Sequence, residues 1–189
     1  MPNEETFRGL YLEQLRDLYS AENQLTKALP KMAKAATNED LKNGFTEHLE
    51  QTRGHVQRLE QIFQALNEKP TGTKCKAMEG LVAEGSEMIE SDFEGAVKDA
   101  GLIAAAQRVE HYEISAYGTA KTFAEVLGDT EAISLLNETE EEERETDEKL
   151  TQLASEINAE ANGGSADAES DDEESSSKPR VVKAKAAKA

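Results

Sequence analysis

Apolar residues recur at alternating steps of three and four along most of the first 162 residues of this chain. Such spacing places them on one face of an α-helix and does not fit the two-residue period of a β-strand. Proline, which interrupts helices, occurs in this part of the chain only at positions 2, 30 and 70. The pattern therefore predicts an all-α protein.

Four long helical segments follow from this spacing, and they cover residues 7–32, 41–66, 102–127 and 132–157. Thr37 and Asn38 fit the N-cap of the second segment. Gly128 and Asp129 fit the end of the third segment and the start of the fourth. Both turns are short, so we expect two antiparallel hairpins. Pro30 lies inside the first segment and predicts a kink or an early end there.

The link between the two hairpins is long. A break at residues 69–72 is followed by a short segment with helical apolar spacing over residues 78–89. A long crossover between two hairpins is the connection found in ferritin-like bundles. We therefore predict a ferritin-like four-helix bundle over residues 1–162, with an extra short helix in the crossover.

The end of the sequence, residues 163–189, has a different composition. Residues 163–177 are acidic, rich in serine and without large apolar residues, and the remainder is rich in lysine, so the segment cannot build a core and we expect a disordered tail. The whole chain has 39 acidic against 21 basic residues and a net charge of −18, which disfavours binding to nucleic acid. Only the lysine-rich end is a candidate contact for nucleic acid, and a solubilising role is the alternative for it.

Two further classes of protein are disfavoured by the sequence. A single cysteine excludes an intramolecular disulfide and a zinc site built from cysteines. No apolar signal segment follows the first residues, and the longest small apolar stretch, residues 100–106, is too short to span a membrane. We expect a cytoplasmic protein without a membrane partner.

The apolar faces of the four long segments are interrupted by polar residues. These residues are Glu22, His48, Thr52, His55, Glu113 and Glu143. Glu22 lies fifteen residues before the first hairpin turn and Thr52 fifteen after it, and Glu113 and Glu143 are placed in the same way about the second turn. Residues equidistant from a hairpin turn face each other to within about one helical turn, roughly 5 Å. The polar positions are therefore expected at one height of the bundle.

A buried carboxylate without a counter-charge costs several kcal/mol. A divalent cation would remove this cost, and carboxylate oxygen with imidazole nitrogen suits iron or manganese. The candidate ligands are Glu22, His48, His55, Glu113 and Glu143. The alternative is a cluster neutralised by inward Arg or Lys or by raised carboxyl pKa values, although inward basic residues are scarce in the apolar faces.

Several neighbouring polar residues are assigned other positions. Glu110, Glu142 and Asp147 lie at the edges of the apolar faces, where they could support a ligand by a hydrogen bond. Glu50 and His111 point away from the apolar faces and are expected at the surface.

Four blocks of sequence carry a resemblance to a known family. They are Leu-Arg-Asp-Leu-Tyr-Ser-Ala-Glu at 15–22, His-Leu-Glu-Gln-Thr at 48–52, Lys-Ala-Met-Glu-Gly-Leu at 76–81 and Leu-Ile-Ala-Ala-Ala-Gln-Arg-Val-Glu-His-Tyr-Glu at 102–113. In this order, over about residues 4–158, the chain resembles the YciE/YciF family of ferritin-like stress proteins. The resemblance implies a ferritin-like bundle with an added helix, a homodimer and a role in stress, and it implies no particular substrate.

The wider ferritin-like di-iron scheme has a Glu on each of two helices and a Glu-x-x-His motif on each of the other two. Glu22 and Glu113 match the single glutamates. The two motifs are incomplete and read Thr52-x-x-His55 and Glu143-x-x-Thr146. Four of the six ligands are present, with His48 as a candidate substitute, so we expect one ion or a weakly bound pair.

Three functional hypotheses follow. The first is a stress-associated protein that binds iron or manganese inside the bundle, with redox chemistry linked to oxygen or peroxide. The second is a non-catalytic dimeric interaction protein with a vestigial metal site. The third is a protector of nucleic acid that acts through the lysine-rich end. The sequence leaves open whether the chain is an enzyme.

Overall fold

The computed structural model describes residues 6–166, and within that range it is entirely helical. Its helices are α1 (Phe7–Ala35), α2 (Glu39–Ala65), α3 (Lys76–Glu90), α4 (Gly95–Leu127) and α5 (Thr130–Ala166). The four long helices and the short crossover helix therefore match the elements predicted from the apolar spacing. None of the helices in the described range is long and apolar enough to cross a membrane.

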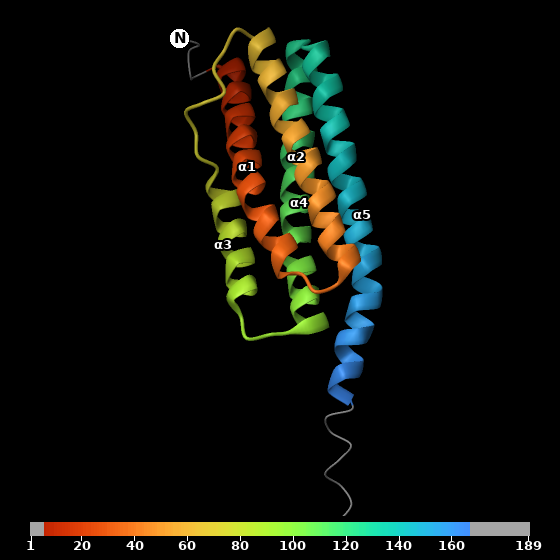
Figure 1. Cartoon of the computed structure of the whole chain (residues 1–189). Coiled ribbons are helices and arrows are strands. Elements are labelled where there is room, and N and C mark those ends of the chain that lie inside the picture. Colours follow the sequence, from red (N-terminus) through yellow and green to blue (C-terminus); the bar gives the residue numbers. More distant parts are fainter. Residues whose placement is uncertain (1–5, 167–189) are drawn as a thin grey trace, which may run out of the picture.

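The four long helices form two antiparallel hairpins that pack side by side (Figure 1). α1 pairs with α2, α4 pairs with α5, and the hairpins meet where α2 contacts α5 and α1 contacts α4. α3 lies outside this bundle and packs against α1 and α4. The predicted arrangement of two hairpins, a crossover and an added helix is confirmed.

The hairpin turns are built by the residues that the sequence indicated. The Asn38 side chain accepts a hydrogen bond of 3.0 Å from the Leu41 N–H at the start of α2. Gly128 ends α4 with φ of 74°, a left-handed conformation that glycine adopts without strain. Asp129 Oδ1 then accepts from the Ala132 N–H in the first turn of α5. These caps fix the register of each hairpin.

Of the two outcomes expected at Pro30, a kink or an early end of the first helix, the early end does not occur, because α1 continues to Ala35. Pro30 is exposed, while Leu29 and Met32 on either side of it are buried in the core. The packing of these side chains holds the last turn in place although proline removes one backbone hydrogen bond.

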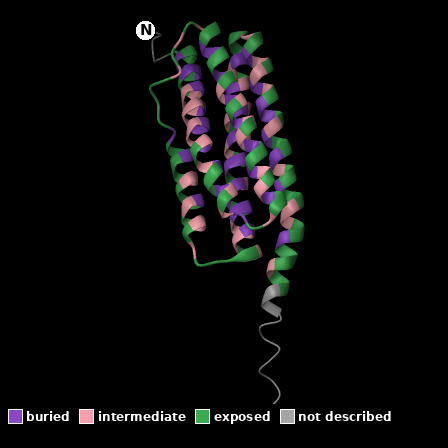
Figure 2. Cartoon of the chain, viewed as in Figure 1, coloured by how far each residue is buried: buried purple, intermediate pink, exposed green. Residues whose placement is uncertain are grey.

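The interior of the bundle is apolar at both ends and polar in the middle. Figure 2 shows the buried residues on the inward faces of the long helices. One apolar cluster includes Leu12, Leu15 and Phe63, and the other includes Leu25 and Phe45. The buried polar residues described next lie between them in the sequence of α1 and α2, so the site is enclosed by core on either side.

The predicted boundary between bundle and tail, at residue 162, falls within the last turns of α5, which extends to Ala166. The rest of the predicted tail, residues 167–189, lies outside the described range.

Candidate metal centre

Six buried side chains from four helices converge at the middle of the bundle. They are Glu22 of α1, His48 and His55 of α2, Glu110 and Glu113 of α4, and Glu143 of α5. Each is at most 3% exposed. The five candidate ligands selected from the sequence are all in this cluster, and Glu110 joins them.

The cluster divides into two groups that share one residue. Glu22, His55 and Glu143 form one group, and His48, Glu110, Glu113 and Glu143 form the other. In each group every residue offers an oxygen or nitrogen atom, and these atoms lie within 4.8 Å of one another. Because Glu143 belongs to both groups, its two oxygens are placed to serve two neighbouring positions.

Glu110 is the member of the cluster that the sequence reasoning missed. It was expected at the edge of an apolar face, yet it is 2% exposed and its Oε1 lies 3.5 Å from His48 Nε2. The available signal was its spacing, since Glu110 precedes Glu113 by three residues and positions i and i+3 share a helix face.

His55 is held between the cluster and a carboxylate at its rim. Its Nδ1 lies 3.0 Å from Glu143 Oε1 and 3.4 Å from Glu22 Oε1. Its Nε2 lies 2.8 Å from Glu142 Oε2, and Glu142 also pairs with Arg58. A histidine that binds a metal commonly donates its other N–H to a carboxylate, so Glu142 has the supporting position expected for it.

His48 has a similar arrangement on the other side of the cluster. Its Nε2 faces Glu110 Oε1 at 3.5 Å and Glu143 Oε2 at 3.8 Å. Its Nδ1 lies 3.4 Å from both Gln51 Oε1 and Thr146 Oγ1. The ring therefore presents one nitrogen to the carboxylates and the other to neutral polar groups.

The two threonines at the incomplete motifs take no part in the donor set. The Thr52 hydroxyl donates to the His48 carbonyl oxygen at 2.8 Å, and the Thr146 hydroxyl donates to the Glu142 carbonyl oxygen at 3.0 Å. The structure supplies Glu110 and His48 as further donors. The set then holds four carboxylates and two imidazoles, which is the composition of the ferritin-like scheme.

Of the residues expected outside the cluster, all except Glu110 are found there. His111 and Glu50 are largely exposed, as predicted. Asp147 contacts His111 and Gln107 instead of a histidine of the cluster. The supporting role suggested for Asp147 is therefore not seen in its contacts.

No Lys or Arg among residues 6–166 forms an ion pair with the four clustered glutamates, whose basic neighbours are His48 and His55. Burial and the charges of neighbouring carboxylates raise the pKa of Glu110 and of Glu113 well above the usual range. Burial disfavours a charged His55, but Glu22 and Glu143 raise its pKa to about 11. Lysine and arginine side chains in the described range thus do not neutralise this cluster.

Apart from the ion-pair contacts with the two histidines given above, several buried atoms of the cluster have no hydrogen-bond partner. They are Glu22 Oε2, His48 Nε2, His55 Nδ1, Glu110 Oε2, and both carboxylate oxygens of Glu113 and of Glu143. Buried polar atoms in native proteins normally have partners, so this concentration needs a cause. Oxygen and imidazole donors in this number fit iron or manganese, and a bound cation would satisfy them.

Tyr117 supports the centre from α4. Its hydroxyl donates to Glu22 Oε1 at 2.5 Å, and the side chain is 1% exposed. Burial and the charge of Glu22 raise the pKa of Tyr117 above its ordinary value of 10.0. The phenol therefore keeps its proton and holds one oxygen of Glu22 in place.

Comparison with known families gives a match over residues 6–162 to the family described as domain of unknown function DUF892. The chain belongs to this family. Protein YciF from Escherichia coli strain K12 is 52% identical over 153 residues, which cover 80% of this chain and 92% of that protein. The resemblance found in the four sequence blocks is confirmed.

Solved structures agree with this assignment. The crystal structure of the E. coli stress protein YciF matches with a TM-score of 0.79 at 51% identity, covering 81% of this chain and 97% of the other. YcfI from Rhodopseudomonas palustris matches with a TM-score of 0.76 at 44% identity, covering 79% and 96%. A ferritin-like, diiron-carboxylate protein from Bacillus anthracis matches with a TM-score of 0.63 at 18% identity, covering 79% and 99%, and this likeness shows the shared fold. The predicted ferritin-like fold is confirmed.

Proposed function

We propose that this protein binds a pair of iron or manganese ions in the middle of its bundle and uses them in redox chemistry during stress. The observation that carries the proposal is the pair of buried donor groups joined through Glu143. Glu22 and His55 would hold one ion, while His48, Glu110 and Glu113 would hold the other. This goes beyond the single ion or weak pair expected from the sequence, because Glu110 adds a donor.

Bound iron or manganese would supply electron exchange with an oxidant such as oxygen or a peroxide. The side chains around the centre orient the donors. Glu142 holds the His55 ring through Nε2, and Tyr117 holds Glu22. The apolar clusters on either side exclude bulk water, so charges within the centre interact strongly.

The biological setting is part of the same proposal. The E. coli relative, at 51% identity, is called a stress protein, which supports a role in stress for this chain. We propose a homodimer on the strength of the family resemblance, and a cytoplasmic location as the sequence analysis expects. Size-exclusion chromatography with light scattering would test the dimer, and a monomer mass would reject it.

Anaerobic titration of the metal-depleted full-length protein with Fe²⁺ or Mn²⁺, followed by metal analysis, tests the centre. We expect two ions per chain. Glu110→Ala should reduce this number to one, because it removes a donor from only one of the two groups. Glu125→Ala, an exposed position on the same helix, should leave the number at two.

Absence of stoichiometric metal would reject the proposal. It would favour the second hypothesis, a non-catalytic interaction protein with a vestigial site. Equal metal content in Glu110→Ala and Glu125→Ala would show that the ions bind elsewhere.

A further inference from the structure

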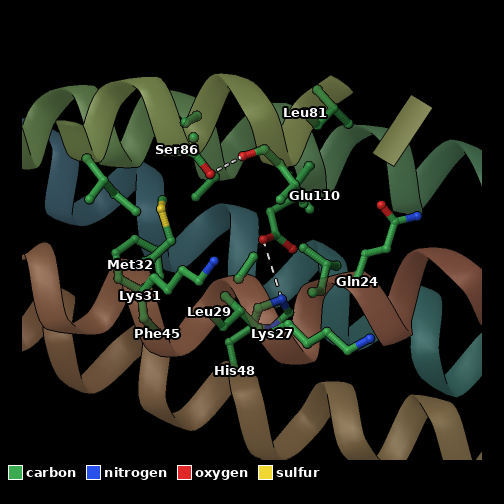
Figure 3. Close-up of a pocket in the computed structure, with 18 residues that line it drawn as sticks. Gln24, Lys27, Leu29, Lys31, Met32, Phe45, His48, Leu81, Ser86 and Glu110 are labelled. Atoms are coloured by element: carbon green, nitrogen blue, oxygen red, sulfur yellow. Dashed lines mark hydrogen bonds and ion pairs between the residues drawn. The ribbon is translucent and has the colours of Figure 1, made fainter. Parts of the chain in front are cut away.

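An apolar cavity of about 210 Å³ lies between the bundle and the added helix α3 (Figure 3). Its walls come from α1, α3 and α4, with a contribution from α2, and include Leu29, Phe45, Val82 and Val109. This volume exceeds the roughly 150 Å³ of an engineered apolar cavity that accepts benzene. The cavity is therefore large enough for a small apolar molecule or part of a longer one.

The cavity reaches the candidate metal centre. His48 and Glu110, which belong to one donor group, are also lining residues. Glu110 is 2% exposed, and its Oε2 has no hydrogen-bond partner. An occupant of the cavity would thus lie beside the proposed ion on that side of the centre.

Lysines are the charged groups at the exposed part of the lining. Lys27 and Lys31 lie one turn apart on α1 (Figure 3), and both side chains are exposed. In the part of the chain that the structure describes, neither forms an ion pair, although the chain has a net charge of −18. Two unpaired cations beside an apolar cavity are complementary to an anion that carries an apolar chain.

We propose that this cavity binds an amphiphilic carboxylate, a fatty-acid-like molecule of medium chain length. Its carboxylate would pair with Lys27 and Lys31, and its alkyl chain would lie against α3 and α4 and point toward Glu110. The opposite orientation is disfavoured because it would place a carboxylate against Glu110. That such a ligand is a substrate rests on the proposed metal centre, whereas binding itself does not.

The added helix α3 forms one wall of this cavity. Leu81, Val82 and Ile89 of α3 are only half-buried although they line the cavity. Gly85 faces the same space, and a Cβ there would lie 3.7 Å from Met32 Sδ, which is ordinary contact. A larger side chain at Gly85 can therefore enter the cavity without displacing backbone.

Isothermal titration calorimetry of the full-length protein with hexanoate, octanoate and decanoate tests the proposal. We expect one site, with affinity rising about three- to fourfold for each added CH₂ as the chain buries more apolar surface. Gly85→Leu should weaken decanoate binding at least tenfold. Gly80→Leu is the matched control on α3, since a Cβ at Gly80 meets nothing within 4 Å.

A second set of variants tests the contact between the lysines and the carboxylate of the ligand. Lys27→Gln with Lys31→Gln should weaken decanoate binding about tenfold and leave decan-1-ol unchanged, because only the acid carries the charge. Lys34→Gln, an exposed position on α1 outside the lining, should change neither.

Ala28→Leu fills the cavity from α1 and replaces Gly85→Leu if that variant fails to fold.

Failure to bind decanoate, affinity independent of chain length, or wild-type binding by a folded cavity-filling variant would overturn the inference. Equal losses for decanoate and decan-1-ol in the lysine variant would reject the carboxylate contact. Metal content, measured on the same preparations, tests the metal centre separately: a protein that loads two ions and ignores decanoate contradicts only the pocket proposal.

Discussion

Glu140 and Glu143 are buried carboxylates three residues apart on α5, and their surroundings are opposite. Glu140 pairs with Lys121 at 2.6 Å and with Arg144 at 2.5 Å. Glu143 faces other glutamates and the two buried histidines, and no Lys or Arg in the described range forms an ion pair with it. Glu140 is neutralised by a lysine and an arginine, whereas Glu143 lies among further acids with only the two buried histidines as basic neighbours.

The pKa values show what opposes burial at each place. Burial alone would raise the pKa of Glu140, but Lys121 and Arg144 lower it below the ordinary value. Burial would also raise the pKa of Glu143, but the buried histidines His55 and His48 lower it. At Glu113 no such partner intervenes, and burial and carboxylate repulsion raise the pKa. Glu140 is thus paired with lysine and arginine side chains of the chain itself, and the clustered glutamates are not. Buried acids without such partners are what a site for an external cation requires.

The largest expected effect is on metal affinity. Glu143→Gln should weaken Mn²⁺ binding by at least about 100-fold, because it removes the donor common to both groups. Glu140→Gln should bind Mn²⁺ as the wild type does. Calorimetric titration of both variants measures this, and equal affinities would remove the distinction between the two carboxylates.

A smaller loss of affinity is expected when the support of a ligand is removed. Glu142→Ala deletes the carboxylate that holds His55 Nε2, and changes of this kind typically cost about 10- to 100-fold in metal affinity. The donors themselves remain, so two ions should still bind at high concentration. Loss of one ion at saturating Mn²⁺ would contradict the supporting role. Glu145→Ala, an exposed position on the same helix, is the control.

Substitution of Glu113 and of Glu140 should change the stability of the metal-free protein in opposite directions. Glu113→Gln should raise the free energy of unfolding by about 1 kcal/mol at neutral pH, because it removes a buried acid that has no cationic partner. Glu140→Gln should lower it by about 1 kcal/mol, since two cations lose their partner. Urea unfolding of chelator-treated protein compares them, and a change of the same sign in both variants would refute the contrast.

The smallest effect concerns pH. Because the folded pKa of Glu140 lies below its ordinary value of 4.5, its stabilising contribution is complete above pH 4.5 and disappears as the pH falls through the folded pKa. The stability difference between wild type and Glu140→Gln should therefore be constant near neutral pH and shrink below pH 4.5. A difference that grows on acidification would contradict this assignment.

The sequence predicted more of the centre than of its surroundings. Counting from the hairpin turns placed Glu22, Glu113 and Glu143 at one height, and the two histidines lay on the inward face of their helix. Glu110 was misplaced because the apolar periodicity gives only the angle of a side chain about the axis of its own helix. Whether a residue at the edge of the apolar face is buried depends on how the neighbouring helix packs against it. Glu110 lies within reach of His48 of α2, a contact that no count along α4 could indicate.

The helices, their caps and the height of the polar layer were determined by the sequence itself, because the helical repeat and capping hydrogen bonds involve residues close along the chain. The tertiary structure alone decided that α1 continues past Pro30, that Glu110 completes the donor set, and that α3 encloses an apolar cavity beside it. These features depend on how far apart and at what rotation the helices pack, and residues distant in the sequence set that geometry.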